Sequence, residues 1–302
     1  FISSMSPIKQ KPVQVGDKVL LYHADYDNQG KTWMFHQYDR TNVIAGLIIF
    51  FLALVLLFGG KKGFSTIIAL GLTMGCVFYF FLPSIFAGFN IYLATILVCI
   101  YVIAFTLILV NGVSYKTISA GIGCIGGLVI SGLIFKIMNT MLELTGLIDE
   151  DSNYLLMLDR PIDLHAIIFS SILIGVLGAV LDVGVSIASS LHEIYPEGGE
   201  YTLKQVMASG MNIGRDIIST MTNTLILVYI GSSLSTTLLL VAYSNSFFEL
   251  INRESIVVEV LQSIIGSIGL VFTIPLTSFF YGLGITRGVG KKTAAKASAA
   301  EL

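Results

Sequence analysis

The stretch DLHAIIFSSILIGVLGAVLDVGVSIASS, residues 163–190, decides the class of the protein. A helix needs about 20 consecutive apolar residues to cross a bilayer core of about 30 Å, and this stretch is longer than that. The middle of the stretch contains one ionisable side chain, Asp182. Because a carboxylate is costly inside hydrocarbon, the sequence predicts a membrane-spanning helix whose acid has a structural or functional role.

The composition of the whole chain agrees with this assignment. Its 302 residues are 55% hydrophobic and 12% charged, and the mean hydropathy is +0.85, whereas charged residues make up about 25% of a typical soluble domain. The formal net charge of -2 gives no strong field to attract nucleic acid. We therefore expect a lipid bilayer around the protein and no nucleic-acid partner.

Outward from residues 163–190, the hydropathy of the chain predicts about seven spans. The windows are 42–60, 64–83, 90–111, 117–138, 163–190, 214–241 and 256–284. Between the fifth and sixth windows, the amphipathic stretch Leu203–Met211 should form a separate short helix at the membrane interface. The expected fold is an all-α polytopic membrane protein with a small N-terminal β segment outside the membrane. The fifth and seventh windows exceed the length of a perpendicular span, so these helices should tilt or kink, the seventh at Pro275.

Lysine and arginine residues in the short loops predict the orientation, because cytoplasmic loops carry an excess of them. One side of the membrane has Lys61, Lys62, Lys116, Lys204, Arg287, Lys291, Lys292 and Lys296. The loops on the other side have only Arg160 and Arg253. The C-terminus is therefore predicted in the cytoplasm and residues 1–40 outside.

Three regions are expected along the chain. In residues 12–40, PVQVGDKVLLYHADYDNQGKTWMFHQYDR, apolar and polar residues alternate on both sides of a turn at residues 27–31, which predicts two strands. Two strands alone are marginally stable, so residues 1–40 should belong to a larger β-module or lean on the membrane body. Residues 41–288 form the transmembrane bundle, and residues 289–302 a disordered cytoplasmic tail.

No motif in the chain indicates catalysis or a metal. The histidines and aspartates near the predicted turn are His23, Asp25, Asp27 and His36, and we interpret them as solvated residues because their spacing imposes no ligand set. The three cysteines, Cys76, Cys99 and Cys124, lie in apolar stretches without paired spacing and should be packing residues. We expect no enzymatic activity, no cofactor and no metal.

The last three predicted spans carry polar stripes at helical spacing. The first stripe is Gly175, Gly178, Ala179, Asp182, Ser186, Ser189, Ser190 and Glu193. The second is Asn212, Asp216, Thr220 and Asn223, with Arg215, Thr222 and Thr224 beside it. The third is Glu259, Gln262, Gly266, Gly269 and Thr273. Three polar faces in one bundle should face each other.

Two interpretations of Asp182 stay open. It is either a structural carboxylate that fixes helix register, or a carboxylate that changes protonation during transport. In both cases we expect it inside the bundle, within reach of donors on the sixth span, Thr220, Thr222, Asn223 or Arg215. The other proton-coupling candidates are Asp216, Arg215, Glu193 and Glu259, and further polar partners are Thr224, Ser186 and Gln262.

A second pattern consists of small residues four positions apart in the fourth span. Gly123, Gly127 and Ser131 form a face that lets another helix backbone approach closely. Gly175 and Gly178 in the fifth span offer a similar surface. These residues are predicted to pack helices, and the face of the fourth span is also a candidate dimer contact.

Several of these runs resemble the YibE/F family of bacterial multi-spanning membrane proteins. The resemblance rests on GVLGAVLDVGVSIASSLHEI (175–194), SGMNIGRDIISTMTNTLILVYIGSSL (209–234) and GSIGLVFTIPLTSFFYG (266–282), on the NxxAGLxxF pattern at Asn42, and on GGKKGF at 59–64. It implies a location in the bacterial inner membrane and a role in transport without an agreed substrate. The family pattern also has a membrane helix and a larger outside β-domain before the position where this sequence begins.

A weaker resemblance links the fifth and sixth spans to the SecD/SecF and RND permease superfamily. That pattern has an aspartate, then a basic and acidic pair, followed by a threonine-rich helix. Asp182 matches the aspartate, Glu193 the acidic residue, and Thr220, Thr222 and Thr224 the threonines, while His192 lies next to the expected basic position. The resemblance implies proton coupling, although fold-level similarity does not establish function.

The leading functional hypothesis is a transport or translocation protein, proton-coupled through Asp182, with an unknown substrate. Because such permeases have two related halves, we expect a homodimer or a complex with a paralogous chain. The alternative is a non-transporting membrane scaffold or accessory subunit, in which the polar stripes only fix helix packing. An intramembrane hydrolase using Asp182, Asp216 and Glu259 is disfavoured because the chain has no YD/GxGD pair.

Overall fold

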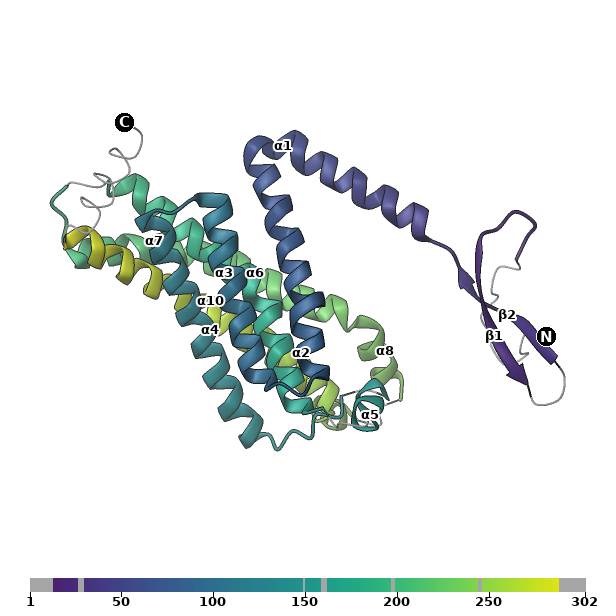
Figure 1. The fold of residues 1–302 in the computed structure, drawn as a ribbon. Helices are drawn as coiled ribbons and strands as arrows, with labels where there is room; N and C mark the ends of the chain where they lie inside the picture. Colours follow the sequence, from purple (N-terminus) through teal and green to yellow (C-terminus); the bar gives the residue numbers. More distant parts are fainter. Residues whose placement is uncertain are drawn as a thin grey trace. The chain divides into compact units, whose positions relative to one another are not determined.

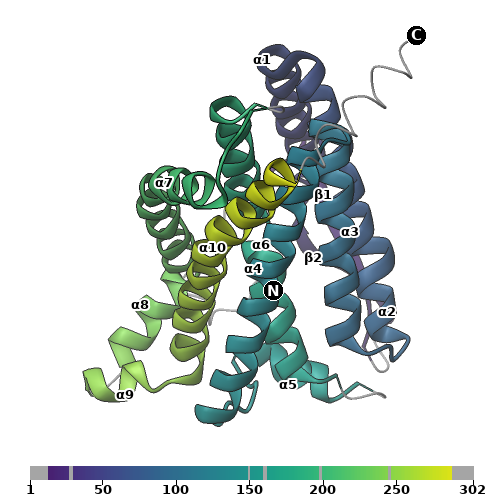
Figure 2. The same cartoon turned by 90° about the vertical axis from the view of Figure 1, so that its left-hand side faces the viewer.

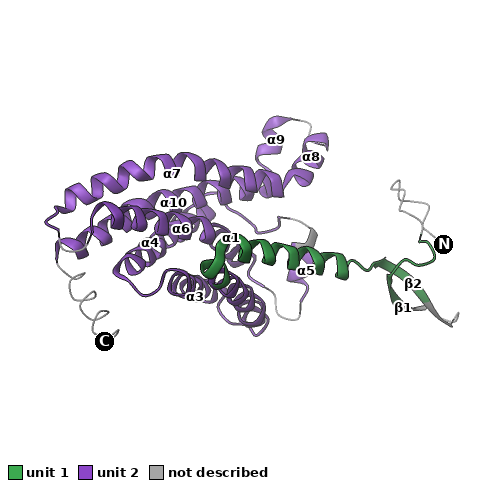
Figure 3. Ribbon diagram, turned by 90° about the horizontal axis from the view of Figure 1, so that it is seen from above, with its two compact units in different colours: residues 1–64 green, residues 65–302 purple. Residues whose placement is uncertain are grey.

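A computed structural model describes residues 13–26, 30–148, 150–158, 162–196, 199–243 and 246–287. Residues 27–29 of the predicted turn at 27–31 and the predicted tail at 289–302 lie outside the described residues, whereas residues 30 and 31 already belong to a strand. The chain divides into two compact units, residues 1–64 and 65–302 (Figure 3).

The first unit begins with a two-stranded hairpin. Strands β1 (Val19–Tyr26) and β2 (Gly30–Tyr38) pair antiparallel from Val19 opposite Tyr38 to Tyr26 opposite Gly30, with a register shift between Leu20 and Leu21. Large apolar side chains stay exposed on it, Leu21 at 51% and Trp33 at 66%. A hairpin of this kind needs further strands or a covering surface to be stable.

Helix α1 (Thr41–Gly75) follows, and its start and break have local causes. The Thr41 N–H donates to Asp39 Oδ1 at 2.9 Å, which satisfies a donor that has no partner within the helix. The helix is interrupted at Gly60, which has φ 52° and ψ -131°, a conformation that favours glycine. After this break the backbone turns back on itself. The two sides of the turn are so close that a Cβ at Gly63 would lie 2.3 Å from the Val55 carbonyl oxygen, so only glycine fits there.

The helical chain continues from α1 through a π-helical segment (η1, Cys76–Phe81) into α2 (Leu82–Phe86). Thr41–Phe86 spans 46 residues, and a straight helix of that length would measure about 70 Å, far more than a bilayer core. The break at Gly60 lies between the two predicted spans 42–60 and 64–83. The π-helical segment precedes Pro83, whose missing N–H removes one helical hydrogen bond.

The second unit is a helical bundle with two central helices, α6 (Leu164–Ile194) and α10 (Glu254–Thr286). Helix α4 (Tyr115–Met141) packs against both, and α3 (Ile91–Asn111) packs against α4 and α6. Helix α7 (Leu203–Ser232) lies along α10 and also contacts α6 (Figures 1 and 2). Short helices α5 (Glu150–Leu156), α8 (Leu234–Tyr243) and α9 (Phe247–Ile251) complete the described elements.

Helix α7 begins earlier than the sequence predicts. The expected sixth span starts at residue 214 after a separate interfacial helix at Leu203–Met211, but α7 is continuous from Leu203. A capping box explains the early start, since the Thr202 hydroxyl accepts from the Gln205 N–H and the Gln205 side chain accepts from the Thr202 N–H. The prediction of a separate interfacial helix is therefore wrong.

The described residues contain five helices long and apolar enough to span a membrane, counting Thr41–Phe86 once. A sixth span results if α7 and α8, which meet at a 62° bend, are taken together. The structure thus supports a multi-pass helical membrane protein with five or six candidate spans. The sequence-based number of about seven counts the two parts of Thr41–Phe86 separately.

The small-residue face of α4 packs against α10 in the same chain. A Cβ at Gly123 would lie 2.8 Å from the Thr277 nitrogen, and one at Gly127 would lie 2.6 Å from the Gly269 oxygen. Ser131 Oγ donates to the Ile265 carbonyl at 3.2 Å. Because this face is already buried within the chain, the suggestion that it joins two copies is not supported.

Candidate functional site

The polar stripe of α6 lies on the exposed side of the helix. Its opposite face is buried, and there Gly184 lies against Cys124 on α4 and Thr273 on α10. Asp182 is two residues away, which places it about 200° around the helix. The exposed members of the stripe are Gly175, Gly178, Asp182, Ser186 and Glu193, and Ala179, Ser189 and Ser190 are half-buried. The prediction that Asp182 is enclosed within the bundle is therefore wrong for the single chain.

Helix α7 also turns polar side chains outward and packs through glycines. A Cβ at Gly210 would lie 2.0 Å from Ser278 Oγ, and one at Gly214 would lie 2.4 Å from Ile274 Cγ2, so this face fits closely on α10. The exposed polar residues of α7 include Asn212, Arg215, Asp216, Thr220, Asn223 and Thr224. Helices α6 and α7 thus each pack against the rest of the bundle through one face and expose polar and charged side chains on another.

Two contacts fix how α6 and α7 run past each other. A Cβ at Gly175 would lie 2.8 Å from the Tyr229 hydroxyl, and one at Gly210 would lie 3.4 Å from Leu191 Cδ1. The helices are therefore antiparallel. Counting seven residues on from Gly175 gives Asp182, and seven back from Tyr229 gives Thr222, so these two residues lie at similar depth.

Several polar side chains of α7 that were candidates to bind Asp182 instead form hydrogen bonds within α7. Thr220 Oγ1 donates to the Ile217 carbonyl at 3.1 Å and Thr224 Oγ1 to the Thr220 carbonyl at 2.9 Å. Arg215 donates to Asn212 Oδ1 at 3.3 Å. Thr222 Oγ1 is buried and has no partner among the described residues. Among the described residues, no hydrogen bond joins Asp182 to Thr220, Thr222, Asn223 or Arg215.

The third stripe, on α10, divides into two parts. Gly266, Gly269 and Thr273 are buried in helix contacts, and Gly269 lies against Ser131 of α4. Gln262 instead donates from Nε2 to Ser171 Oγ on α6 at 2.8 Å. Glu259 is half-buried, and its Oε2 atom is enclosed without a partner in the described part of the chain.

The residues predicted to pack α6 behave differently from each other. Gly175 is covered by the Tyr229 side chain, whereas a Cβ at Gly178 would have no atom within 4 Å. The expectation of close packing at Gly178 is therefore wrong. The open surface beside Gly178 lies one helical turn from Asp182, so the polar part of α6 has room for a partner or for water.

The model of the YibE/F-like protein family matches residues 47–287. The chain belongs to the YibE/F-like family. No curated protein and no solved structure shows a significant match. The match covers the helical bundle and all three polar stripes of the YibE/F-like chain, whereas the similarity to the SecD/SecF and RND permeases finds no support in these comparisons.

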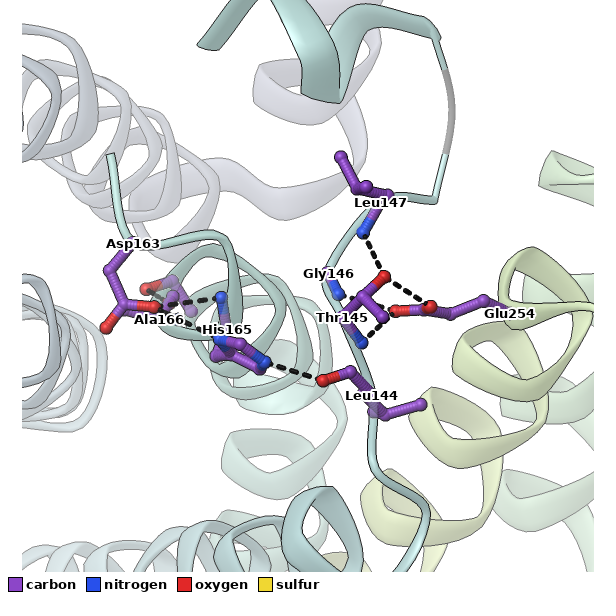
Figure 4. Close-up of polar contacts among 9 residues, drawn as sticks. Leu144, Thr145, Gly146, Leu147, Asp163, His165, Ala166 and Glu254 are labelled. Atoms are coloured by element: carbon purple, nitrogen blue, oxygen red, sulfur yellow. Dashed lines mark hydrogen bonds and ion pairs between the residues drawn. The ribbon is translucent and has the colours of Figure 1, made fainter. Parts of the chain in front are cut away.

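At one end of the YibE/F-like bundle, a carboxylate on α10 binds the loop that follows α4 (Figure 4). Glu254 at the start of α10 accepts from the Thr145 N–H at 2.8 Å, the Thr145 hydroxyl at 2.7 Å and the Gly146 N–H at 2.5 Å. Gly146 has φ 85°, which turns successive N–H groups toward one anion. Sequence analysis missed this role, because the pattern that forms it is a loop conformation.

The same loop is fixed to the start of α6. His165 Nε2 lies 2.7 Å from the Leu144 carbonyl oxygen (Figure 4). Asp163 Oδ1 accepts from the backbone N–H groups of His165 at 3.0 Å and Ala166 at 3.2 Å, which caps the start of α6. The loop thus connects α4, α6 and α10, which favours one rigid end of the bundle.

The opposite end of the bundle contains a buried tyrosine. The Tyr281 hydroxyl donates to the Tyr195 carbonyl at 3.2 Å and lies 3.1 Å from His192 Nδ1. The Tyr195 hydroxyl lies 2.7 Å from Ser209 Oγ on α7. Glu193, one of the proton-coupling candidates, is exposed beside this network.

The cysteines are free, and Cys99 and Cys124 are buried. Cys124 Sγ donates to the Val180 carbonyl at 3.3 Å, which is a packing role. Within the described ranges, no group of three or more His, Cys, Asp or Glu residues is placed to hold a metal ion. Asp27 lies outside the described residues, as do the side chains of His23 and Asp25.

Proposed function

We propose that this YibE/F-like protein is a membrane transport or translocation protein whose polar pathway runs along the exposed faces of α6 and α7. One observation carries the proposal. Asp182 lies near the middle of a membrane-length helix and is exposed there. A carboxylate at the centre of a bilayer costs roughly 2.5–3.5 kcal/mol on insertion scales, so water or another polar surface should cover it.

The neighbouring groups suit proton coupling. Thr222 offers an enclosed hydroxyl at the same depth, without a partner among the described residues, and Arg215 provides a cation about 10 Å further along the same helix, toward its start. An ionised Asp182 attracts this cation, whereas a protonated Asp182 is neutral and removes the attraction. Uptake of a proton therefore changes which arrangement of α6 and α7 is favoured, which is the requirement for coupling.

The pathway is completed by a second copy of the chain or by a paralogous subunit. The polar faces of α6 and α7 have no cover among the described residues, and the small-residue face of α4 is already occupied by α10. A homodimer that joins the two polar faces removes both from lipid. It also places two Asp182 carboxylates along one pathway.

The test uses purified protein in liposomes with an internal pH dye, an imposed pH gradient and a panel of candidate substrates. Asp182→Asn keeps the size of the side chain and removes its titration. We expect substrate-dependent proton movement in the native protein and its loss in Asp182→Asn, with unchanged elution and melting in detergent. The matched control is Glu249→Gln on α9, a carboxylate that pairs with Arg253 at 3.3 Å. Full proton movement in Asp182→Asn rejects the coupling role.

The second candidate function is a membrane scaffold or accessory subunit. The same uncovered polar face favours it, because a partner membrane protein could bind there and satisfy Asp182. In that case Asp182→Asn weakens co-purification of the partner without any proton movement in liposomes. The two functions therefore differ in whether the isolated protein supports flux.

The orientation is part of the proposal. The excess of basic residues in the loops at the end of the bundle where α6 finishes favours a cytoplasmic C-terminus in the bacterial inner membrane. An alkaline phosphatase fusion at Leu302 should be inactive, and a green fluorescent protein fusion at the same residue should fluoresce. The reverse pattern overturns the orientation.

A further inference from the structure

A groove between α3 and α4 lies away from the Asp182 face. Its volume is about 650 Å³, within the range of small-molecule sites. Apolar side chains form its walls, among them Ile96, Ile100, Ile103, Val129 and Leu133. The absence of a side chain at Gly132 leaves the Phe169 ring of α6 as the floor, since a Cβ there would lie 3.1 Å from Phe169 Cε2.

The length of the groove corresponds to one leaflet of a bilayer. Along α3 its lining extends from Tyr92 to Ile103, which is a rise of about 16 Å. Half of a hydrocarbon core of about 30 Å is about 15 Å. The groove therefore has the length of a single acyl chain that ends near the middle of the membrane.

Only one end of the groove is polar. Lys136, Asn139 and Thr140 line it near the Met141 end of α4, where the helix ends. Lys136 is exposed, and its ammonium forms no hydrogen bond or ion pair with the described residues. Asn139 Oδ1 is enclosed and has no partner in the described part of the chain. One cation and one acceptor are thus available at the depth of lipid headgroups.

We propose that this groove binds a phospholipid from the leaflet at the Met141 end of α4. One acyl chain lies along the apolar walls, the phosphate pairs with Lys136, and a headgroup N–H or O–H donates to Asn139 Oδ1. The ammonium of lysine binds phosphate as a compact charge, and the amide oxygen accepts up to two hydrogen bonds. Phosphatidylglycerol and phosphatidylethanolamine both supply a phosphate and such a donor.

The dimensions favour a lipid chain over a protein helix. A helix with side chains is 10–12 Å across, so 16 Å of it would occupy about 1,200 Å³ or more, roughly twice the volume of the groove. An apolar helix would also leave Lys136 and Asn139 Oδ1 without partners. The proposal is independent of proton coupling at Asp182.

The experiment measures lipid binding to the delipidated full chain in detergent by native mass spectrometry, with phosphatidylglycerol and diacylglycerol as probes. Lys136→Gln should weaken phosphatidylglycerol binding about fivefold, the effect of about one surface lysine near anionic lipid. Val129→Trp places a large ring in the groove and should reduce binding of both probes. Diacylglycerol, which has no phosphate, should bind the native protein about fivefold more weakly than phosphatidylglycerol.

Matched controls distinguish the groove from general attraction. Lys116→Gln removes a lysine from the other end of α4, and Val113→Trp adds a ring to an exposed position outside the lining; both should bind phosphatidylglycerol as the native protein does. Equal loss in Lys136→Gln and Lys116→Gln overturns the phosphate assignment. Unchanged lipid binding in Val129→Trp, or a change in its oligomeric state instead, overturns the lipid proposal in favour of a helix in the groove.

Discussion

Two small-residue faces of this protein have similar spacing and opposite surroundings. On α4, Gly123 and Gly127 are pressed against the backbone of α10, whereas on α6 Gly178 faces open space beside the exposed Asp182. The difference shows that small residues three or four positions apart mark a surface for close approach without specifying what approaches. For α4 the partner is in the same chain. For α6 and α7 we propose a water-filled pathway completed by a second copy.

The largest expected effect is a difference in melting temperature between leucine substitutions on the two faces. Gly127→Leu forces side-chain atoms into the Gly269 carbonyl and Thr273, so the protein should lose about 3 kcal/mol or more of stability and melt at least about 6 °C lower in detergent. Gly178→Leu has no atom within 4 Å to displace and should melt within about 2 °C of the native protein. Similar melting of both variants contradicts the contrast between the faces.

The next effect concerns water access to the open face. In a background with Cys76, Cys99 and Cys124 replaced by serine or alanine, Ser186→Cys should react with a membrane-impermeant thiosulfonate on the order of 100 times faster than Val129→Cys, because only a thiolate in water is nucleophilic. Val129 is also exposed, at 55%, but on a lipid-facing wall. Equal, slow labelling at the two positions contradicts water access and shows that lipid or a tightly bound partner covers the exposed face of α6.

A smaller effect is expected at the rigid end of the bundle. Glu254→Gln keeps the shape of the side chain and removes the charge that three donors share, so it should cost about 1–2 kcal/mol. Glu249→Gln, which loses a surface ion pair, should cost less than about 1 kcal/mol. Thermal melting of both variants measures the difference, and a larger loss for Glu249→Gln contradicts the role of Glu254.

The smallest effect is a pH dependence at the start of α1. Hydrogen bonds from the Thr41 side chain and backbone hold the pKa of the Asp39 carboxyl below its ordinary value. A carboxyl with a lowered pKa stabilises the fold above its unfolded pKa, and this contribution disappears as the pH falls through the folded pKa. Acidification below about pH 4 should therefore weaken the first turn of α1, seen as a lower protection factor of the Thr41 amide, the intrinsic exchange rate divided by the observed rate. Asp39→Asn should make this protection factor independent of that titration.

The sequence predicted what depends on local periodicity. Long apolar windows located the helices, and a spacing of three or four residues placed Gly175, Asp182 and Ser186 on one face of α6. Whether this polar face is buried or exposed depends on the opposite face of α6, which packs at Gly184 against α4 and α10. That choice is a matter of tertiary packing, so the exposed position of Asp182 could not be read from α6 alone.

Hydropathy also failed to locate the start of α7 and the turn at Thr145 and Gly146. Polar residues between Leu203 and Asn212 lowered the apolar signal, although the capping pair Thr202 and Gln205 was visible in the sequence and marks the true start of α7. The anion-binding turn at Thr145 and Gly146 depends on backbone conformation. A glycine after a threonine in a loop is too common a pattern to predict it.

The hydroxyl pair between Tyr195 and Ser209 has a mechanical consequence. It fastens the beginning of α7 to the end of α6, while the Tyr229 hydroxyl at the far end of α7 has no partner among the described residues. Helices α6 and α10 are joined through the Leu144–Gly146 loop at one end and through Tyr281 at the other. Among the described residues, the Tyr229 end of α7 therefore makes no side-chain hydrogen bond to α6 or α10 and is held by packing, whereas the start of α7 is fixed to α6 by the Tyr195–Ser209 pair.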